Sequence, residues 1–332
     1  MPTVDTPSMT SPPTLFLSRE AERLGSSRQL RKLRGRGALV RVATGVFTPV
    51  AEWEALTVDE QYRARVRAAS LISGPHSQFS HDSAAAMWRL PSIGPWSRDV
   101  HELTQRAAGG TSRVGIRRHA LGRDSHPALV DDVTVTSLTR TLIDVSCAGP
   151  FVRSVAMVEF GLRDKVDGRG ASTKLELLGM MDALEPYRGL TRARKVVDFA
   201  SPLSDSPGES FSRVQFLALG YPDPQQQVEF WDEEGFIGFV DFFWPELGLI
   251  CEFDGRSKYG KQREYQRDLT LEQILMREKD REDRLRRVSR SFVRLDWAKV
   301  SDRRRLAAYL RPHGLVEQGR STRLVREPIS AS

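Results

Sequence analysis

The spacing of apolar residues changes character along the chain. Near the N-terminus, two leucines three residues apart share one face, so the pattern predicts a helix over 28–34, preceded by a shorter one over 18–24. Residues 38–48 follow as two short apolar segments with a turn at Thr44-Gly45, which predicts a β-hairpin. The order helix, turn, basic helix and hairpin is typical of a winged helix-turn-helix.

The C-terminal part contains long apolar segments that are typical of buried strands. The pattern there predicts a helix over 209–220 and strands over 227–231, 236–244 and 249–254. A long charged helix that ends at about residue 287 and a fourth strand over 291–296 follow. This mixture of helices and strands predicts an α+β fold.

The middle of the chain mixes both patterns. It predicts a helix over 80–88, short strands over 100–103 and 114–119, and a strand that passes into a helix over 133–145. Four of the histidines in this part are candidates for a catalytic or metal role: His81, His101, His119 and His126. Their spacing matches no ligand pattern such as HExxH, so we interpret them as structural or surface residues rather than as a catalytic or metal site.

Composition divides the chain further. Residues 201–208 hold two prolines and three serines, which predicts a linker. The predicted segments are a disordered tail (1–14), a winged-helix domain (15–50), a middle domain (51–200), the linker (201–208), a C-terminal α/β domain (209–310) and a weakly structured tail (311–332).

The overall composition excludes several classes of protein. The 332 residues are 39% hydrophobic and 28% charged, as in globular proteins with real cores. Two isolated cysteines exclude a disulfide scaffold and a zinc finger. No stretch of about 18 uncharged apolar residues is present, and the N-terminus does not resemble a signal peptide. We therefore expect a cytoplasmic protein with no membrane partner.

Positive charge is concentrated near the N-terminus. The net charge is +7, and residues 18–50 carry eight basic and two acidic side chains. A helix in the major groove needs such cations for phosphates and base edges, which favours double-stranded DNA as the partner. The candidate DNA-binding residues are Arg28, Arg31, Lys32, Arg34 and Arg41, together with Lys279 from the charged helix. The alternative is a solvated basic helix with no ligand.

The N-terminal segment resembles a known family. From Ser18-Arg-Glu-Ala, through the Leu-Arg-Lys-Leu-Arg-Gly-Arg-Gly turn, to Leu39–Phe47, it is similar to the N-terminal domain of AbiEi-type antitoxins of type IV toxin–antitoxin systems. The order of elements in 51–200 resembles the region that follows in that family. The resemblance implies a DNA-binding winged helix that acts in autoregulation as a transcriptional regulator, and a cognate toxin as a further partner.

Three acidic residues interrupt the apolar strands of the C-terminal part. Asp241 lies just past the middle of one strand, and Glu252 and Asp254 lie near the end of the next, on one face because they are two residues apart. Buried carboxylates that converge repel one another unless a cation lies between them, and oxygen ligands suit Mg²⁺ or Mn²⁺. The alternative is that they are hydrogen-bonded residues at strand ends.

This C-terminal pattern resembles the PD-(D/E)XK nuclease fold, and in particular a domain of uncertain function related to the very-short-patch-repair endonucleases. The resemblance rests on Val240-Asp-Phe-Phe-Trp-Pro245, on Cys251-Glu-Phe-Asp-Gly-Arg-Ser-Lys-Tyr259 and on the late stretch 281–294. It implies a nuclease-like α/β sandwich with Asp241 and Glu252 as metal ligands, Glu209 as a partner acid on a helix, and Lys258 where relatives often carry histidine.

One position departs from the nuclease pattern. The superfamily has lysine two residues after the glutamate, and Asp254 occupies that place here. Lys258 or Lys279 could supply the cation from elsewhere, or cleavage has been lost and the fold only binds DNA.

Three functional hypotheses follow. The first is a Mg²⁺-dependent DNA endonuclease in which Glu209, Asp241, Glu252, Asp254 and Lys258 form the catalytic site. The second is a non-catalytic AbiEi-type antitoxin and repressor with a degenerate nuclease fold. The third is an interaction module that neutralises a toxin through its middle segment.

Overall fold

The computed structural model describes residues 12–74, 76–104, 114–119, 124, 126–163, 171–184, 187–254 and 270–317. The described residues form a mixed α/β fold with three sheets, so the α+β class is confirmed at that level. They divide into two compact units. Of these residues, the N-terminal unit contains those within 12–149 and 171–197, and the C-terminal unit contains those within 150–163 and 198–317.

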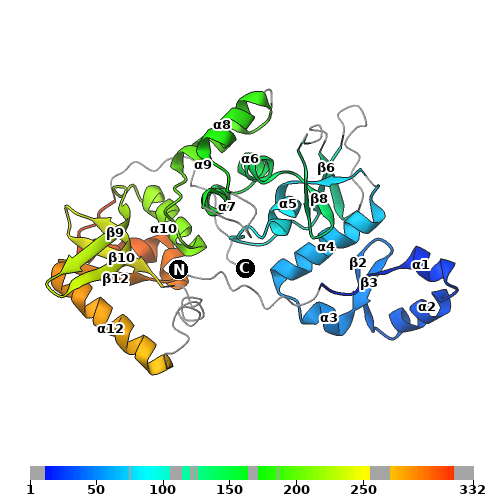
Figure 1. The fold of residues 1–332 in the computed structure, drawn as a ribbon, viewed down its shortest axis with the longest axis horizontal. Helices are drawn as coiled ribbons and strands as arrows, with labels where there is room; N and C mark the ends of the chain where they lie inside the picture. Colours follow the sequence, from blue (N-terminus) through cyan, green and yellow to red (C-terminus); the bar gives the residue numbers. More distant parts are fainter. Residues whose placement is uncertain are drawn as a thin grey trace. The chain divides into compact units, whose positions relative to one another are not determined.

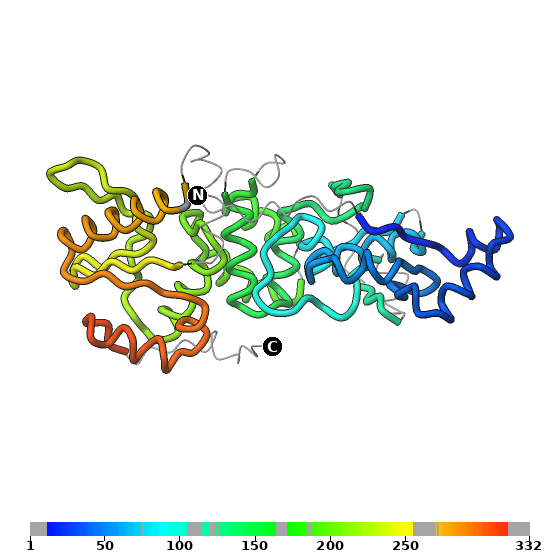
Figure 2. The backbone as a smooth tube through the Cα atoms, turned by 90° about the horizontal axis from the view of Figure 1, so that it is seen from below, coloured from blue at the N-terminus to red at the C-terminus, as the bar shows by residue number. Residues whose placement is uncertain are grey.

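The N-terminal unit begins with a small three-stranded sheet and the helices around it. These elements are β1 (Phe16–Leu17), α1 (Ser18–Arg23), α2 (Ser27–Gly35), β2 (Leu39–Ala43), β3 (Val46–Pro49), α3 (Val50–Glu54) and α4 (Val58–Ile72). The sheet has the order β1-β3-β2, and Leu17, Val46 and Ala68 form its core. The predicted pair of helices and hairpin are thus confirmed as elements, and α1 and α2 lie next to each other (Figures 1 and 2).

A five-stranded sheet with the order β6-β5-β4-β8-β7 follows in the same unit. Its strands and the accompanying helices are β4 (Gln78–Phe79), α5 (His81–Met87), β5 (Val100–Leu103), β6 (Ile116–His119), β7 (Ala128–Val130), β8 (Val133–Val135), α6 (Leu138–Ala148), α8 (Lys174–Ala183) and α9 (Leu190–Phe199). The strand β4 pairs with both β5 and β8, so it joins two segments that are distant in sequence.

The C-terminal unit is built on a four-stranded sheet with the order β12-β11-β10-β9. Its elements are α7 (Phe151–Leu162), α10 (Pro207–Ala218), β9 (Gln225–Asp232), β10 (Gly235–Trp244), β11 (Leu249–Phe253), α12 (Leu271–Val288), β12 (Ser291–Leu295), α13 (Trp297–Val300), α14 (Arg303–Leu310) and the 3-10 helix η2 (Arg311–His313). The helix α12 lies along one face of this sheet (Figures 1 and 2), where Leu285 packs against Val240 and Ile250.

The predicted C-terminal elements match the observed ones closely, with one extension. The helix predicted from Glu209 begins at Pro207, so the last two residues of the predicted linker form its first turn. Gly208 is required there, because a Cβ would lie 2.0 Å from the Phe253 ring. In the segment predicted as a tail, Leu315 is buried. Both segments therefore contribute to the packing of the C-terminal unit.

None of the helices in the described ranges is both long and apolar enough to cross a lipid bilayer.

Candidate functional site

The basic helix α2 exposes its cations. None of its residues is buried, and Arg28, Arg31 and Lys32 are exposed. In the part of the chain that the structure describes, none of these three side chains makes an ion pair. Such cations keep their charge available for a ligand, because no internal acid neutralises it.

The two remaining candidate cations of this region, one on α2 and one on β2, contact neutral groups. The Arg34 guanidinium lies over the Phe47 ring, 4.5 Å from its centroid, and so connects α2 with β3. Arg41, exposed on β2, donates a hydrogen bond of 3.3 Å to the Thr44 hydroxyl in the hairpin turn. The structure thus places the five predicted DNA-binding residues of this region on one helix and the neighbouring hairpin.

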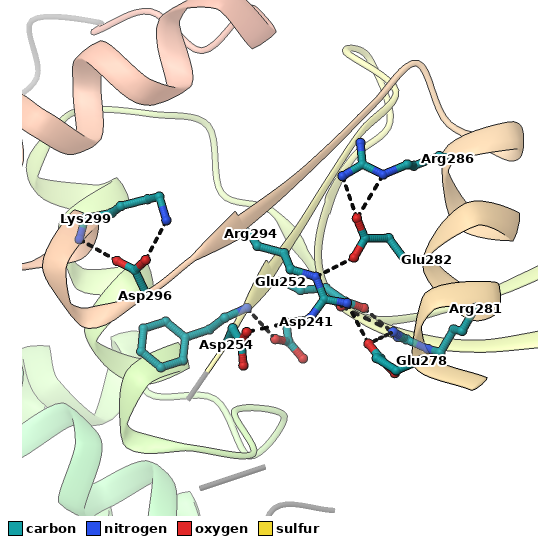
Figure 3. Close-up of polar contacts among 11 residues, drawn as sticks. Asp241, Glu252, Asp254, Glu278, Arg281, Glu282, Arg286, Arg294, Asp296 and Lys299 are labelled. Atoms are coloured by element: carbon teal, nitrogen blue, oxygen red, sulfur yellow. Dashed lines mark hydrogen bonds and ion pairs between the residues drawn. The ribbon is translucent and has the colours of Figure 1, made fainter. Parts of the chain in front are cut away.

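In the C-terminal unit, the strands that carry the predicted acids are paired. Strands β10 and β11 are antiparallel with Phe242 opposite Cys251. One position further along this register, Asp241 lies opposite Glu252. The Asp241 carboxylate accepts a 2.8 Å hydrogen bond from the Phe253 amide of β11. The expectation that Asp241 lies close to the end of the following strand, β11, is confirmed (Figure 3).

The cation that contacts Glu252 is an arginine. Glu252 is only 3% exposed, and the Arg281 guanidinium donates to both of its oxygens, at 2.5 Å and 3.3 Å. A further Arg281 hydrogen bond of 2.7 Å goes to the Phe239 carbonyl. Burial alone would lower the pKa of Arg281, but the Glu252 carboxylate outweighs it and raises that pKa.

Arg294 extends this arrangement along β12. Its guanidinium donates to Glu278 at 2.6 Å and to Glu282 at 2.8 Å, and it lies 3.8 Å from Glu252 and 3.9 Å from Asp254. Burial opposes the charged form of Arg294, yet these carboxylates raise its pKa. The acids of this region are therefore held together by two arginines (Figure 3).

This arrangement bears on the predicted Mg²⁺ or Mn²⁺ site. Both oxygens of Glu252 already accept hydrogen bonds from Arg281, and one oxygen of Asp241 accepts from a backbone amide. Mg²⁺ at about 2.0–2.1 Å from these oxygens would lie next to the positive charge of the Arg281 guanidinium. As arranged, the carboxylates do not fit such an ion, because Arg281 already neutralises Glu252 and would repel a second cation.

The other predicted site residues have separate positions. Glu209 is 1% exposed in the first turn of α10, where it accepts from the Ser206 hydroxyl at 2.7 Å and the Asp205 amide at 2.8 Å, as a helix-capping residue does. Lys279 is exposed on α12, and Lys258 lies outside the described residues. The structure thus explains Glu209 by a local structural role.

Three of the four candidate histidines converge, which the sequence spacing did not indicate. His81 begins α5, and His101 and His119 lie on the adjacent parallel strands β5 and β6. One nitrogen of each histidine lies within 4.8 Å of the others, and the His101 and His119 ring nitrogens are joined by a 2.9 Å hydrogen bond. We call these residues the histidine cluster; His126 is not part of it.

The histidine cluster is surrounded by polar groups. The Ser80 hydroxyl lies 2.9 Å from His81 Nδ1, and the Ser97 hydroxyl lies 2.8 Å from His101 Nε2. Burial, together with neighbouring histidines and basic residues, lowers the pKa of both His81 and His119 to about 3. Both imidazoles are therefore neutral near pH 7, which leaves their lone pairs for bonding.

Comparison with known proteins identifies relatives without a described activity. No family model matches the chain. "Uncharacterized protein Rv2248" of Mycobacterium tuberculosis strain H37Rv and "Uncharacterized protein MT2308" of strain CDC 1551 are each 31% identical over 241 residues, which cover 70% of this chain and 80% of the relative. The chain belongs to the family of these two proteins. Neither name specifies a ligand or reaction, so function has to be argued from this member's own residues.

Sheet pairing explains why the histidine cluster of this family member is not evident from the sequence. The parallel register puts Leu103 opposite His119 and His101 opposite Arg117, which places the two histidines two positions apart on adjacent strands. The Ser80 amide then bonds the His101 carbonyl at 3.0 Å and brings His81 to the same place. In the structure, His81 has a φ of +50°, which is unusual for a residue other than glycine.

Proposed function

We propose that this protein binds double-stranded DNA through α2, with the β2–β3 hairpin as an adjoining wing. The observation that carries the proposal is the row of exposed cations on α2, of which Arg28, Arg31 and Lys32 have no ion-pair partner among the described residues. Lysine and arginine that neutralise phosphates release condensed counterions, which supplies most of the non-specific affinity for DNA. The resemblance of 18–47 to an antitoxin winged helix supports the same function.

The function we infer is that of a non-catalytic repressor of the antitoxin type, with a nuclease-like C-terminal unit. The pairing of Glu252 with Arg281 supports the absence of cleavage, because the guanidinium neutralises the carboxylate that would otherwise attract a metal ion. A cognate toxin would be the second partner, and a toxin-like gene next to this one would support that part of the proposal.

The test is a titration of duplex DNA at several salt concentrations, read by fluorescence anisotropy. Replacement of both Arg31 and Lys32 by glutamine should lower the slope of log affinity against log salt by about 0.9 for each lost phosphate contact. The matched control is Arg286→Gln on α12, which removes an exposed arginine that already pairs with Glu282. Equal losses in both proteins, or none in either, would contradict the proposed role of α2.

A metal-dependent endonuclease is the second candidate, favoured by the adjacent positions of Asp241 and Glu252 on paired strands. It predicts nicking of supercoiled plasmid in Mg²⁺ or Mn²⁺ that is lost in Asp241→Ala and Glu252→Ala. The repressor proposal predicts no nicking in either metal. Nicking that these alanine variants retain would indicate a contaminating nuclease rather than this site.

A further inference from the structure

The histidine cluster is a set of metal-ligand groups outside the acidic site. We propose that His81, His101 and His119 form a three-histidine site for a divalent transition metal, with Zn²⁺ as the ion that it binds. The proposal concerns the N-terminal unit alone and does not rest on DNA binding or cleavage.

The geometry requires only a small contraction. The three ligand nitrogens lie within 4.8 Å of one another, whereas Zn–N bonds of about 2.0–2.1 Å place tetrahedral ligands roughly 3.4 Å apart. The longest separation must therefore shorten by about 1.4 Å, which imidazole rotation can supply. The 2.9 Å hydrogen bond between His101 and His119 would be replaced by two bonds to the metal.

One oxygen of a buried carboxylate next to the cluster accepts no hydrogen bond from the described residues. Asp144 is fully buried, and its Oδ1 accepts from Arg140 at 2.9 Å and from the Tyr187 hydroxyl at 2.6 Å. Its Oδ2 accepts no hydrogen bond from the described residues and lies 3.8 Å from His81 Nδ1. Buried oxygens are almost always paired, and a divalent cation on His81 would supply the missing positive charge.

The surroundings also match those of bound zinc. Metal-bound histidines usually hold their second ring nitrogen in a hydrogen bond to a polar group, which fixes the ring. Ser97 is that polar group for His101. Ser80 is that group for His81, whose Nδ1 also lies 3.8 Å from the Asp144 carboxylate. Imidazole ligands select zinc, copper, iron or nickel over Mg²⁺ or Ca²⁺, and three histidines leave a fourth position for water.

The partial exposure of His119 indicates where that fourth position would open. His81 and His101 are 6% and 8% exposed, whereas His119 is half-buried. A metal held by the three would therefore be reached by solvent from the His119 side. Zinc sites with three protein ligands and one water are typical of catalytic rather than purely structural zinc.

The test uses the full-length protein after removal of metals with a chelator. Titration with Co²⁺ should give the visible absorption of a tetrahedral complex at one ion per chain, and calorimetry should give one Zn²⁺ per chain. His119→Gln should weaken Zn²⁺ binding at least about 100-fold and abolish the Co²⁺ absorption. The matched control is His76→Gln, an exposed histidine outside the cluster, which should bind as the unmodified protein does.

Two further variants keep the experiment decisive. Ser97→Ala retains all three histidines and should weaken Zn²⁺ binding about tenfold by releasing the His101 ring, even if His119→Gln fails to fold. Arg286→Gln should leave binding unchanged, since this exposed arginine belongs to the other unit. The proposal is overturned if the unmodified protein binds no Zn²⁺, if Ser97→Ala and His119→Gln both bind normally, or if Arg286→Gln or His76→Gln loses the ion.

Discussion

Two helices of this protein, α2 and α12, are both rich in arginine, but they use that charge differently. On α12, arginines 281, 284 and 286 pair with acids, and the shortest contacts are 2.5 Å, 2.5 Å and 2.6 Å. On α2, Arg28, Arg31 and Lys32 make no ion pair within the described ranges. Hence Arg281 and Arg284 hold α12 to the sheet, through Glu252 and Asp232, whereas the cations of α2 are available to a ligand.

The comparison shows that the number of charges does not predict their role. A buried carboxylate such as Glu252 needs a cation, so the arginine that supplies it is committed to the fold. An exposed cation contributes little to stability and retains its attraction for phosphate. Four predictions test this contrast, from the largest expected effect to the smallest.

The largest effect is expected on stability. Arg281→Ala would leave Glu252 buried without its main partner, and breaking such a pair costs about 3–5 kcal/mol. Since the Arg281 side chain is 24% exposed, we expect the lower end, about 3 kcal/mol, in urea unfolding followed by tryptophan fluorescence. Arg31→Ala on α2 should change the free energy of unfolding by less than about 0.5 kcal/mol. Similar losses of unfolding free energy in the two variants would contradict the view that α12 uses its arginines for stability and α2 does not.

The second prediction gives α2 an internal acid. Arg28→Glu places a carboxylate four residues before Lys32, where the two side chains can pair and stabilise the helix by about 0.2–0.5 kcal/mol. DNA binding should lose two cations instead of one, so its salt slope should fall by about 1.8, against about 0.9 for Arg28→Gln. Equal slopes for the two variants would show that an ion pair within α2 does not stop Lys32 from contacting phosphate.

The third prediction concerns Lys279, the candidate DNA contact on α12. It is exposed, and no carboxylate of the described residues pairs with it, so it resembles the α2 cations rather than its neighbours. Lys279→Gln should lower the salt slope of DNA binding by about 0.9, less than the Arg28→Glu variant does. An unchanged slope would confine the DNA contact to the N-terminal unit.

The smallest effect is expected at the ion pair between Arg284 of α12 and Asp232 of β9. The hydrogen bond from Arg284 lowers the pKa of Asp232 to about 2, so the pair stabilises the fold above pH 3.8 and this contribution is lost as pH falls toward 2. In Arg284→Gln, carboxylate NMR should show that pKa rising toward 3.8. The pKa of Asp296, which Lys299 lowers, should not change. A rise at both positions would indicate general unfolding.

The local elements were largely predictable from the sequence. Strand β10 was predicted over 236–244 and is Gly235–Trp244, and β11 was predicted over 249–254 and is Leu249–Phe253. These segments are apolar and bounded by turn residues, so short-range pattern is sufficient to predict them. The same holds for α2, whose basic residues lie between turn signals at both ends.

The partners of the candidate residues were not predictable in the same way. The sequence predicted that Asp241 and Glu252 approach each other and need a cation, but it could not show that Arg281, 29 residues after Glu252, meets that carboxylate. Nor could spacing show that His81, His101 and His119 meet, because that depends on which strands of the sheet are neighbours.

The sequence by itself determined where helices and strands form, where positive charge is concentrated and which acids lie on apolar strands. These properties depend on residues within a few positions of one another. Only the tertiary structure decided which charges are neutralised and which histidines converge, because a contact between distant segments is set by sheet order and helix packing. The α2 cations, which have no ion-pair partner among the described residues, and the three histidines are thus products of the fold as much as of composition.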